Sequence, residues 1–375
     1  MNINNLPVRK VGFNDQISGE VSLFSPVFRY PQNPILTPAE INEVWNDPAL
    51  QVITVHNAGV VSFKDETIML FRSHLRCGKS VIGLARSADG VRSWRIEPKP
   101  VLLPASEKDL FAPDVDIKKQ IKTEAGGVED PRVIFIDGKY AITYSAYHAE
   151  IKNRVRVCLA TTEDFVSFER HGPMLEKEMR NVVIFPEKIE NRYVGLFRPN
   201  DITEGDLGGT FTQIKTGSSE DWIKGHWEID PEPVMLTGGG PSAFSDKIGP
   251  GAPPVKTSHG WLSLFHGVRS TMTGNPYVLG VALHDLVNPR KVKMSSIPVL
   301  FPTRADCRIP ESQYTHVPQV VFTCGALDKG DGIIYIYYGG NDTVMNLAVT
   351  HVEILAALCE HYGQDPLTGR LNYEL

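Results

Sequence analysis

The chain has 375 residues, of which 42% are hydrophobic and 22% are charged, and its formal net charge is -6 at pH 7. This composition is typical of a globular protein with a sizeable core. The negative charge argues against nucleic acid or an anionic membrane as the main partner, and no apolar stretch reaches the ~18 residues that a membrane span needs.

A short segment with helical periodicity at 38–45 precedes five β-hairpins that recur along the chain. In each hairpin an apolar, β-rich run leads through a tight polar turn into a second run rich in aromatic residues. The paired runs are 60–63 with 67–72, 133–136 with 139–147, 182–185 with 192–198, 254–257 with 260–268, and 320–324 with 332–339. The sequence therefore predicts a repeat.

A third strand is predicted after each hairpin, and most copies end in a turn that holds a Ser or Thr, an acid and then an aromatic residue. Ser87 and Asp89 stand in this turn in the first copy, and Thr162 and Asp164 in the second. Because such carboxylates cap backbone amides, we assign Asp89 and Asp164 to structure.

The hairpin turns recur every 53 to 72 residues, a spacing that suits four-stranded blades with long loops. We therefore predict an all-β fold, a five-bladed β-propeller with short N- and C-terminal helical extensions, the second at 352–362. It would form a single domain over 1–375, with the propeller core at about 50–350. A six-bladed propeller that uses the N-terminal segment is the alternative, and a β-sandwich fits the long repeat less well.

Polar residues stand at similar strand ends in successive repeats, and inner strands of a propeller converge on one axis, so we expect one site there. Two carboxylates and a guanidinium stand together in the tetrad Glu129-Asp130-Pro131-Arg132. Further candidates in the other repeats are Asn57, Arg72, Tyr147, Arg180, Arg198, His266 and Asp342. Arg180, Arg198 and His266 suit an anion and Asp130 suits proton transfer. Equally, His266 would suit a core histidine and Asp342 a turn cap.

Other chemistries find little support in the chain. It has no H-E-x-x-H, no paired-cysteine zinc spacing, no Asp-rich calcium loop, no G-x-S-x-G and no Walker-type loop, so we predict no metal site and no organic cofactor. The five cysteines are scattered and indicate reduced thiols. With no secretory signal in the first 13 residues, we predict a cytoplasmic protein.

Six motifs in order resemble glycoside hydrolase family 130, the family of β-mannoside phosphorylases and some β-1,2-mannosidases. They are S-A-D-G at 87–90, G-V-E-D-P-R at 127–132, F-P-E-K-I at 185–189, F-R-P at 197–199, F-H-G-V at 265–268 and Y-Y-G-G-N-D-T at 337–343. The resemblance implies a five-bladed propeller. It also implies cleavage of a β-mannoside by inorganic phosphate, a co-substrate, with inversion to α-mannose 1-phosphate.

The resemblance also implies roles for single residues. Asp130 would be the proton donor, acting through the mannosyl 3-hydroxyl. The implied phosphate ligands are Arg180, Arg198 and His266, with Lys215 as a possible fourth. Sugar binding would fall to Asn57, Arg72, Glu129, Arg132, Tyr147 and Asp342. The chain departs from the family pattern at Phe197, often a histidine, and at Ser73-His74, where an acid is usual.

Three functions stay open from the sequence. The first is an inverting β-mannoside phosphorylase, for which the resemblance also implies a homo-oligomer, since family members often assemble. The second is an inverting β-1,2-mannosidase that uses Glu187 or another acid as base, and the third is a non-catalytic carbohydrate-binding propeller. Linkage, acceptor sugar and chain length are not set by these motifs.

Overall fold

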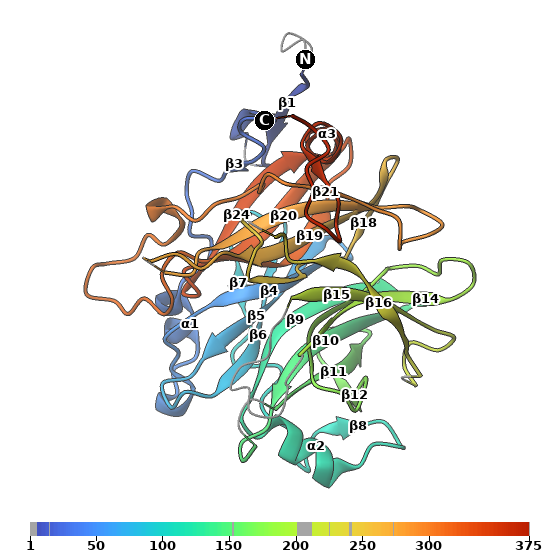
Figure 1. Cartoon of the computed structure of the whole chain (residues 1–375). Coiled ribbons are helices and arrows are strands. Elements are labelled where there is room, and N and C mark those ends of the chain that lie inside the picture. The colour runs from blue at the N-terminus through green and yellow to red at the C-terminus, as the bar shows by residue number, and fades with distance from the viewer. Residues whose placement is uncertain are drawn as a thin grey trace.

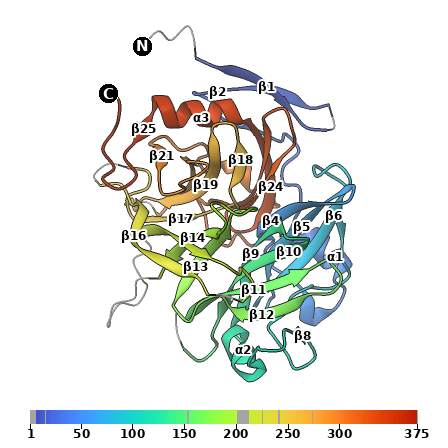
Figure 2. The ribbon, with the colours of Figure 1, turned by 90° about the vertical axis from the view of Figure 1, so that its right-hand side faces the viewer.

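The computed structural model describes residues 6–14, 16–151, 154–200, 212–224, 226–239, 242–272 and 274–374, and strands are their main regular structure (Figure 1). The strands form five successive antiparallel units, here numbered one to five in chain order, and a separate two-stranded hairpin. The first strand, β1 (Val8–Gly12), lies at the same end of the molecule as α3 (Val352–His361), whereas α2 (Ile117–Glu124) lies at the opposite end (Figures 1 and 2).

The first two units share one sheet. Unit one contains β4 (His56–Phe63), β5 (Glu66–His74), β6 (Ser80–Ser87) and β7 (Arg95–Ile96). Unit two contains β9 (Gly127–Ile136), β10 (Lys139–Tyr147), β11 (Val155–Thr162) and β12 (Glu169–Pro173), with β8 (Leu110–Phe111) parallel to β12. A single parallel bridge, Ser80 with Gly127, joins the two units.

The remaining units form three separate sheets. Unit three contains β13 (Met179–Ile184), β14 (Tyr193–Pro199), β15 (Gln213–Ser219) and β16 (Glu228–Leu236). In unit four, β17 (Lys247–Pro250) and β18 (Val255–Thr257) both pair with β19 (Gly260–Val268), followed by β20 (Tyr277–His284), β21 (Val292–Ser295) and β25 (Gly363–Gln364). Unit five contains β22 (Val321–Asp328), β23 (Ile333–Gly340), β24 (Val344–His351) and β3 (Phe28–Arg29).

All five predicted hairpins and the third strand after each are confirmed. Their turns carry the residues that the sequence indicated: Asp137 and Asp331 have positive φ angles of 49° and 51°. Asp89 and Asp164 cap turns as predicted, since each carboxylate accepts two backbone N–H groups. The local patterning of the chain therefore decides most of the strands.

The first strands of the units are neighbours in space. β4 contacts both β9 of unit two and β22 of unit five, while β9 contacts β13 and β13 contacts β17. Apolar clusters fill the space between adjacent units; Ile134, Val182 and Phe197, for example, pack together between units two and three. This packing brings the ends of the first strands, where the polar candidates stand, close to one another.

The N-terminal segment completes the last unit instead of forming a sixth. β3 pairs with β24 through Phe28–Val349 and Arg29–Ala348, and Arg29 makes an ion pair with Asp306 at 2.8 Å. β1 (Val8–Gly12) and β2 (Ser18–Ser22) form only a two-stranded hairpin. The predicted core of about 50–350 thus omits β3, because a pairing across ~320 residues leaves no local pattern.

Two of the helices lie where the sequence predicts them, and one does not. α1 (Pro38–Val44) begins with a capping box between Thr37 and Glu40 and follows the predicted segment, as does α3. Helix α2 lies in the long connection between units one and two, where the sequence analysis predicts no helix. It is held by a buried carboxylate, so its stability comes from tertiary contacts.

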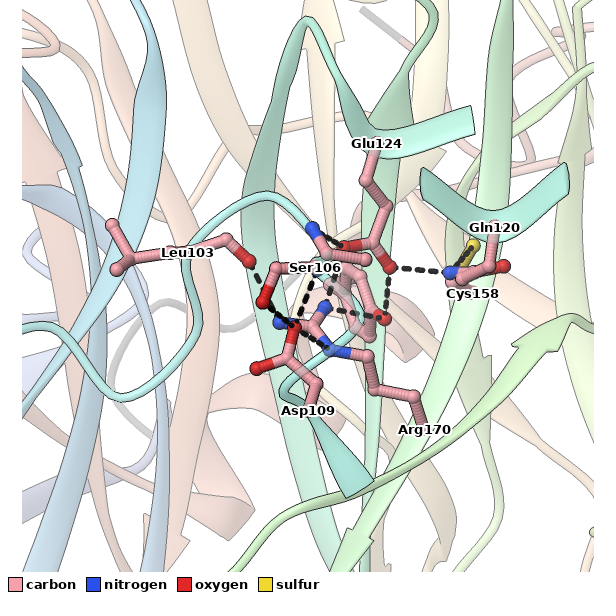
Figure 3. A network of polar contacts seen from close by, with 9 residues as sticks. Leu103, Ser106, Asp109, Gln120, Glu124, Cys158 and Arg170 are labelled. Atoms are coloured by element: carbon pink, nitrogen blue, oxygen red, sulfur yellow. Dashed lines mark hydrogen bonds and ion pairs between the residues drawn. The ribbon is translucent and has the colours of Figure 1, made fainter. Parts of the chain in front are cut away.

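That carboxylate, Glu124, is the centre of a polar network between α2 and unit two (Figure 3). Glu124 makes an ion pair with Arg170 of β12 and accepts from the Tyr144 hydroxyl at 2.7 Å and from the Ala105 N–H at 2.9 Å. Arg170 also donates to the Leu103 carbonyl at 2.7 Å. The network fixes the segment that enters β9, the strand with the E-D-P-R tetrad.

Glu124→Ala should therefore destabilise the protein strongly. It would leave the Arg170 guanidinium buried without its carboxylate, which costs about 3–5 kcal/mol in comparable sites. Glu176→Ala is the matched control, because Glu176 pairs with Lys119 at the surface, where ion pairs contribute about 0–1 kcal/mol. Urea unfolding followed by circular dichroism measures both, and equal losses would contradict the structural role of the network.

Candidate active site

The first strands of units one to three carry a β-bulge at the same place. Asn57, Asp130 and Asn181 have φ angles of 49°, 52° and 54°, and the pairing register shifts beside each of them. A bulge re-aims side chains, and Asn and Asp tolerate this left-handed backbone better than other residues with a side chain. The bulges turn these side chains out of the alternation that a regular strand would impose.

The Asp130 carboxylate is held by two residues of unit one. Its Oδ1 accepts from Asn57 Nδ2 at 3.0 Å and from an Arg72 guanidinium nitrogen at 3.0 Å. The other terminal nitrogen of Arg72 lies 2.7 Å from Glu129 Oε1, which also accepts from the Ser80 hydroxyl at 2.6 Å. One guanidinium therefore bridges the two adjacent carboxylates of the tetrad.

Arg72, Glu129 and Asp130 are mostly removed from water, with only 13–14% of each side chain exposed. Burial alone would raise the pKa of Glu129, but Arg72, with help from His74 and Ser80, lowers it to about 2. Glu129 is thus ionised at neutral pH and can only accept hydrogen bonds. A sugar hydroxyl that meets it must donate.

Asp342 joins this cluster from the turn between β23 and β24. Burial raises the pKa of its carboxyl to about 7; the attraction of Arg72 opposes that rise, and repulsion from Asp130 and Glu129 adds to it. At neutral pH the group therefore exists in both protonation states. The turn-cap alternative does not account for this environment, because a turn-capping carboxylate has a lowered pKa, as Asp164 does.

Arg132 has a different role from the predicted one. Its donors bond to the carbonyl oxygens of Gly251 at 2.8 Å, Asp130 at 2.8 Å and Pro250 at 3.3 Å. It is buried and joins the bulge of unit two to the interruption between β17 and β18 in unit four. Arg132 therefore positions Asp130, and its guanidinium is not presented to a sugar.

Cations gather on units three and four. Arg180 and Arg198 stand directly opposite each other on β13 and β14, and Arg198 lies 2.8 Å from Nε2 of His266 on β19. Burial lowers the pKa of Arg198 to about 9, with repulsion from Arg180 and Arg132 adding to the effect. Lys247 at the start of β17 has its pKa lowered by burial and by the same two arginines, Arg198 and Arg180.

His266 is neutral in this cluster. Burial and the charges of Arg198, Arg132 and Lys247 lower its pKa well below the usual value. Because a guanidinium only donates, Nε2 accepts from Arg198 and the imidazole proton stays on Nδ1. The mutual repulsion of the cations means that an anion bound among them would be stabilised.

Tyr147 lies between the acidic and the cationic groups. Its ring centroid is 5.0 Å from the guanidinium carbon of Arg180. Burial raises the pKa of its hydroxyl, and the charge of Glu129 adds to that rise. Tyr147 therefore stays protonated and can donate a hydrogen bond at the junction of the two clusters.

Two predicted residues lie elsewhere. Lys215 lies on β15, the third strand of unit three, and its ammonium donates to the Pro231 carbonyl at 2.6 Å. Lys247 stands among the cations instead. Glu187 makes a surface ion pair with Lys256 at the β13–β14 turn, half exposed, at the opposite end of these strands from Arg180. The sequence could have indicated Lys247, because this residue stands before the hairpin of unit four as Arg180 stands before the hairpin of unit three.

Over the described ranges, no group of three or more His, Cys, Asp or Glu side chains is arranged to hold a metal ion. Within the same ranges, none of the helices has the length and apolar character needed to cross a membrane.

A family model described as β-1,4-mannooligosaccharide phosphorylase, that of glycoside hydrolase family 130, matches residues 26–361. The chain belongs to glycoside hydrolase family 130. The resemblance drawn from the six motifs is thereby confirmed. The matched range also includes β3, which the predicted core omitted.

Family relatives with assigned activities align over most of their length. The chain is 29% identical to a 1,2-β-oligomannan phosphorylase and 31% identical to a β-1,2-mannobiose phosphorylase, both of Thermoanaerobacter sp. strain X514; each alignment covers 87% of this chain and 97% of the relative. Among solved structures, β-1,2-mannobiose phosphorylase of Listeria innocua in complex with β-1,2-mannobiose superposes with a TM-score of 0.72 at 26% identity. That superposition covers 89% of this chain and 99% of the Listeria one.

The raised pKa of Asp342 predicts a pH-dependent stability. Its pKa is 3.8 in the unperturbed state and about 7 when folded, so between these values the folded chain holds a proton that the unfolded chain releases. This contribution to the free energy of unfolding is present below about pH 4 and is lost as the pH rises to about 7. Asp342→Asn should therefore lack this decline.

Urea unfolding in small steps between about pH 4 and about pH 8 measures the difference between wild type and variant. Asp164→Asn is the control: backbone N–H groups lower the pKa of Asp164, so its contribution changes only below about pH 4 and the variant should keep the decline seen in wild type. If wild type and Asp342→Asn show parallel pH profiles, Asp342 does not titrate in this window.

Proposed function

We propose that this chain is an inverting β-mannoside phosphorylase. It would cleave a β-mannosyl disaccharide or oligosaccharide with inorganic phosphate and release α-D-mannose 1-phosphate and a shortened sugar. The observation that carries the proposal is the pair of adjoining clusters, one of carboxylates around Asp130 and one of cations around Arg198. The names of the three relatives reported above, which are phosphorylases that act on mannosides, support it.

In the proposed reaction a phosphate oxygen attacks the anomeric carbon of the mannosyl unit while the bond from that carbon to the glycosidic oxygen breaks. Asp130 supplies the proton that the leaving oxygen takes up, by the family resemblance through the mannosyl 3-hydroxyl. Arg180, Arg198, Lys247 and His266 would hold the phosphate. Charged groups that are preorganised to hold the anion beside the developing positive charge of the sugar supply much of the catalytic effect in such sites.

The hydrolase alternative needs a second carboxylate to activate water, commonly ~6.5–9.5 Å from the acid. Glu187, the acid considered for that role, is paired with Lys256 at a surface turn. The charged groups on the Arg180 side of Tyr147 are cations, which suit an attacking anion. The non-catalytic alternative gives no reason for placing a held carboxylate beside a buried anion site.

We further propose that the five units are the blades of a five-bladed β-propeller, formed by a single domain over 1–375. The contact of β22 with β4 and the pairing of β3 with β24 support closure of the last unit against the first part of the chain. Around the mannosyl unit we place Asn57, Arg72, Glu129, Tyr147 and Asp342. A cytoplasmic location, a homo-oligomeric state and the absence of any cofactor beyond phosphate as co-substrate stay predictions.

The activity should depend on phosphate and on Asp130. With β-mannobioses of different linkage, wild type should release mannose 1-phosphate only when phosphate is present. Asp130→Asn keeps the size of the side chain but removes the acid, so turnover should fall by about 10²–10⁴-fold. Turnover that continues unchanged in phosphate-free buffer would support the hydrolase; binding without turnover by wild type would support the carbohydrate-binding module.

Arg198→Ala should weaken phosphate use far more than sugar use. Loss of charge-assisted hydrogen bonds of about 1.5–3 kcal/mol corresponds to a KM for phosphate raised about 10- to 150-fold. Lys215→Ala is the control, since Lys215 contacts a backbone carbonyl outside the cluster. Steady-state kinetics with either substrate varied separates the two effects. Equal rises in both KM values for Arg198→Ala would contradict the assignment of Arg198 to the phosphate site.

A further inference from the structure

The long connection from β21 to β22, residues 296–320, borders the candidate active site. Most of it is exposed, and its regular structure is limited to one turn of 3₁₀ helix at Arg304–Asp306. Connections of this length in a compact protein are usually functional. Its last part is bonded to the turn that carries Asp342: His316 N–H donates to Thr343 Oγ1 at 2.9 Å, and Val317 N–H donates to the Asn341 carbonyl at 3.1 Å.

A row of contacts leads from this connection into the site. The Tyr314 hydroxyl lies 2.7 Å from His316 Nδ1, and the His316 ring meets the His74 ring edge to face at 4.6 Å. His74 Nε2 in turn lies 2.7 Å from a nitrogen of Arg72, which holds Asp130. The row therefore runs from the surface to the residue that positions the proposed acid.

The row offers hydrogen-bonding side chains and no carboxylate. Because the Arg72 guanidinium only donates, His74 Nε2 accepts a hydrogen bond from it. His74 stands where the family pattern usually has an acid. Burial and the neighbouring His74 and Arg72 lower the pKa of His316. Imidazoles and a phenol hydroxyl suit a ligand that carries several hydroxyl groups.

The stereochemistry of the proposed reaction indicates on which side of the anomeric carbon this row lies. In an inverting displacement the attacking and leaving groups occupy opposite faces of the anomeric carbon. The cations for the attacking phosphate belong to units three and four, through Arg180 and Arg198 on β13 and β14 and His266 on β19. The row belongs to unit one and to the connection that enters unit five. It thus lies on the side of the leaving sugar.

Tyr314 is suited to contact such a sugar. Its side chain is 51% exposed although its hydroxyl is bonded to His316, so the ring stands fixed at the surface beside the site. Binding sites for small polar ligands combine apolar or aromatic walls with a few placed polar groups. A pyranose ring offers C–H groups to the aromatic face and hydroxyls to the imidazole.

We propose that Tyr314 and His316, backed by His74, form the acceptor subsite, which binds the sugar unit that leaves in phosphorolysis and that accepts mannose in the reverse reaction. The inference rests on the proposed function for the side that it assigns. The ligand is a neutral hexose unit. Tyr314 and His316 are specificity-determining residues in this proposal and take no part in proton transfer.

The reverse reaction tests this subsite, with α-mannose 1-phosphate as donor and mannose or glucose as acceptor, followed by phosphate release. Tyr314→Ala should raise the KM for the acceptor about tenfold, equivalent to one aromatic contact, and leave the KM for mannose 1-phosphate within about twofold of wild type. Tyr314→Phe keeps the ring and should stay close to wild type. His316→Ala should again raise the KM for the acceptor alone.

Phe24→Ala is the matched control, since Phe24 is an exposed aromatic residue, 76% accessible, in the N-terminal segment. It should change neither KM. Unchanged kinetics for Tyr314→Ala, or equal rises in both KM values, would overturn the subsite while the proposed function stands.

A wild type without phosphate-dependent turnover in either direction would overturn the proposed function. In that case calorimetric titration with β-mannobiose compares wild type with Tyr314→Ala directly. An affinity lowered about tenfold would support the sugar contact, and equal affinities would overturn it.

Discussion

The site depends on one guanidinium. Arg72 holds two adjacent carboxylates, Glu129 and Asp130, in a place that is largely closed to water. Two neighbouring buried carboxylates would repel each other and take up protons, and their geometry would be lost. Arg72 comes from the second strand of unit one, whereas the carboxylates belong to the first strand of unit two. The interaction therefore couples the position of the acid to the packing of two units.

On the cationic side of the site, like charges lie close together. Arg180 and Arg198 face each other across a strand pair, where like charges are destabilising, and burial adds to the cost. The convergence is tight: a Cβ on Gly249 would lie 2.5 Å from His266 and 2.7 Å from Arg198, so this position requires glycine. Such a cluster suits the anion of the proposed reaction, and the energy of binding that anion would then be available for catalysis.

The sequence predicted the parts of the fold that depend on local pattern. Hairpins, third strands and turn-capping acids follow from alternation and turn chemistry, and all were found where expected. The pairing of β3 with β24 and the docking of α2 through Glu124 depend on contacts between distant residues, which leave no periodic signal. Whether a strand forms depends mainly on the local sequence, whereas its register and packing depend on contacts between distant residues.

The same distinction applies to the site. Asn57, Arg72, Glu129, Asp130 and Asp342 were identified from strand ends of the repeat or from motifs, and they do come together in the structure. Arg132 and Lys215 were assigned from the family resemblance, but one bonds to backbone carbonyls and the other to Pro231. A bulge changes which way a side chain points, so residue type at a strand end indicates a candidate and not its direction.

The arrangement also separates the parts of the proposed reaction. In the proposed reaction, proton supply lies in units one and two and anion binding in units three and four, on strands held by buried contacts. The row from Tyr314 to His74 lies mostly on an exposed connection, where sequence can change without disturbing a strand pair. A change of acceptor sugar would then require only new residues in this connection. A change from phosphate to water would require removal of buried cations from two units at once.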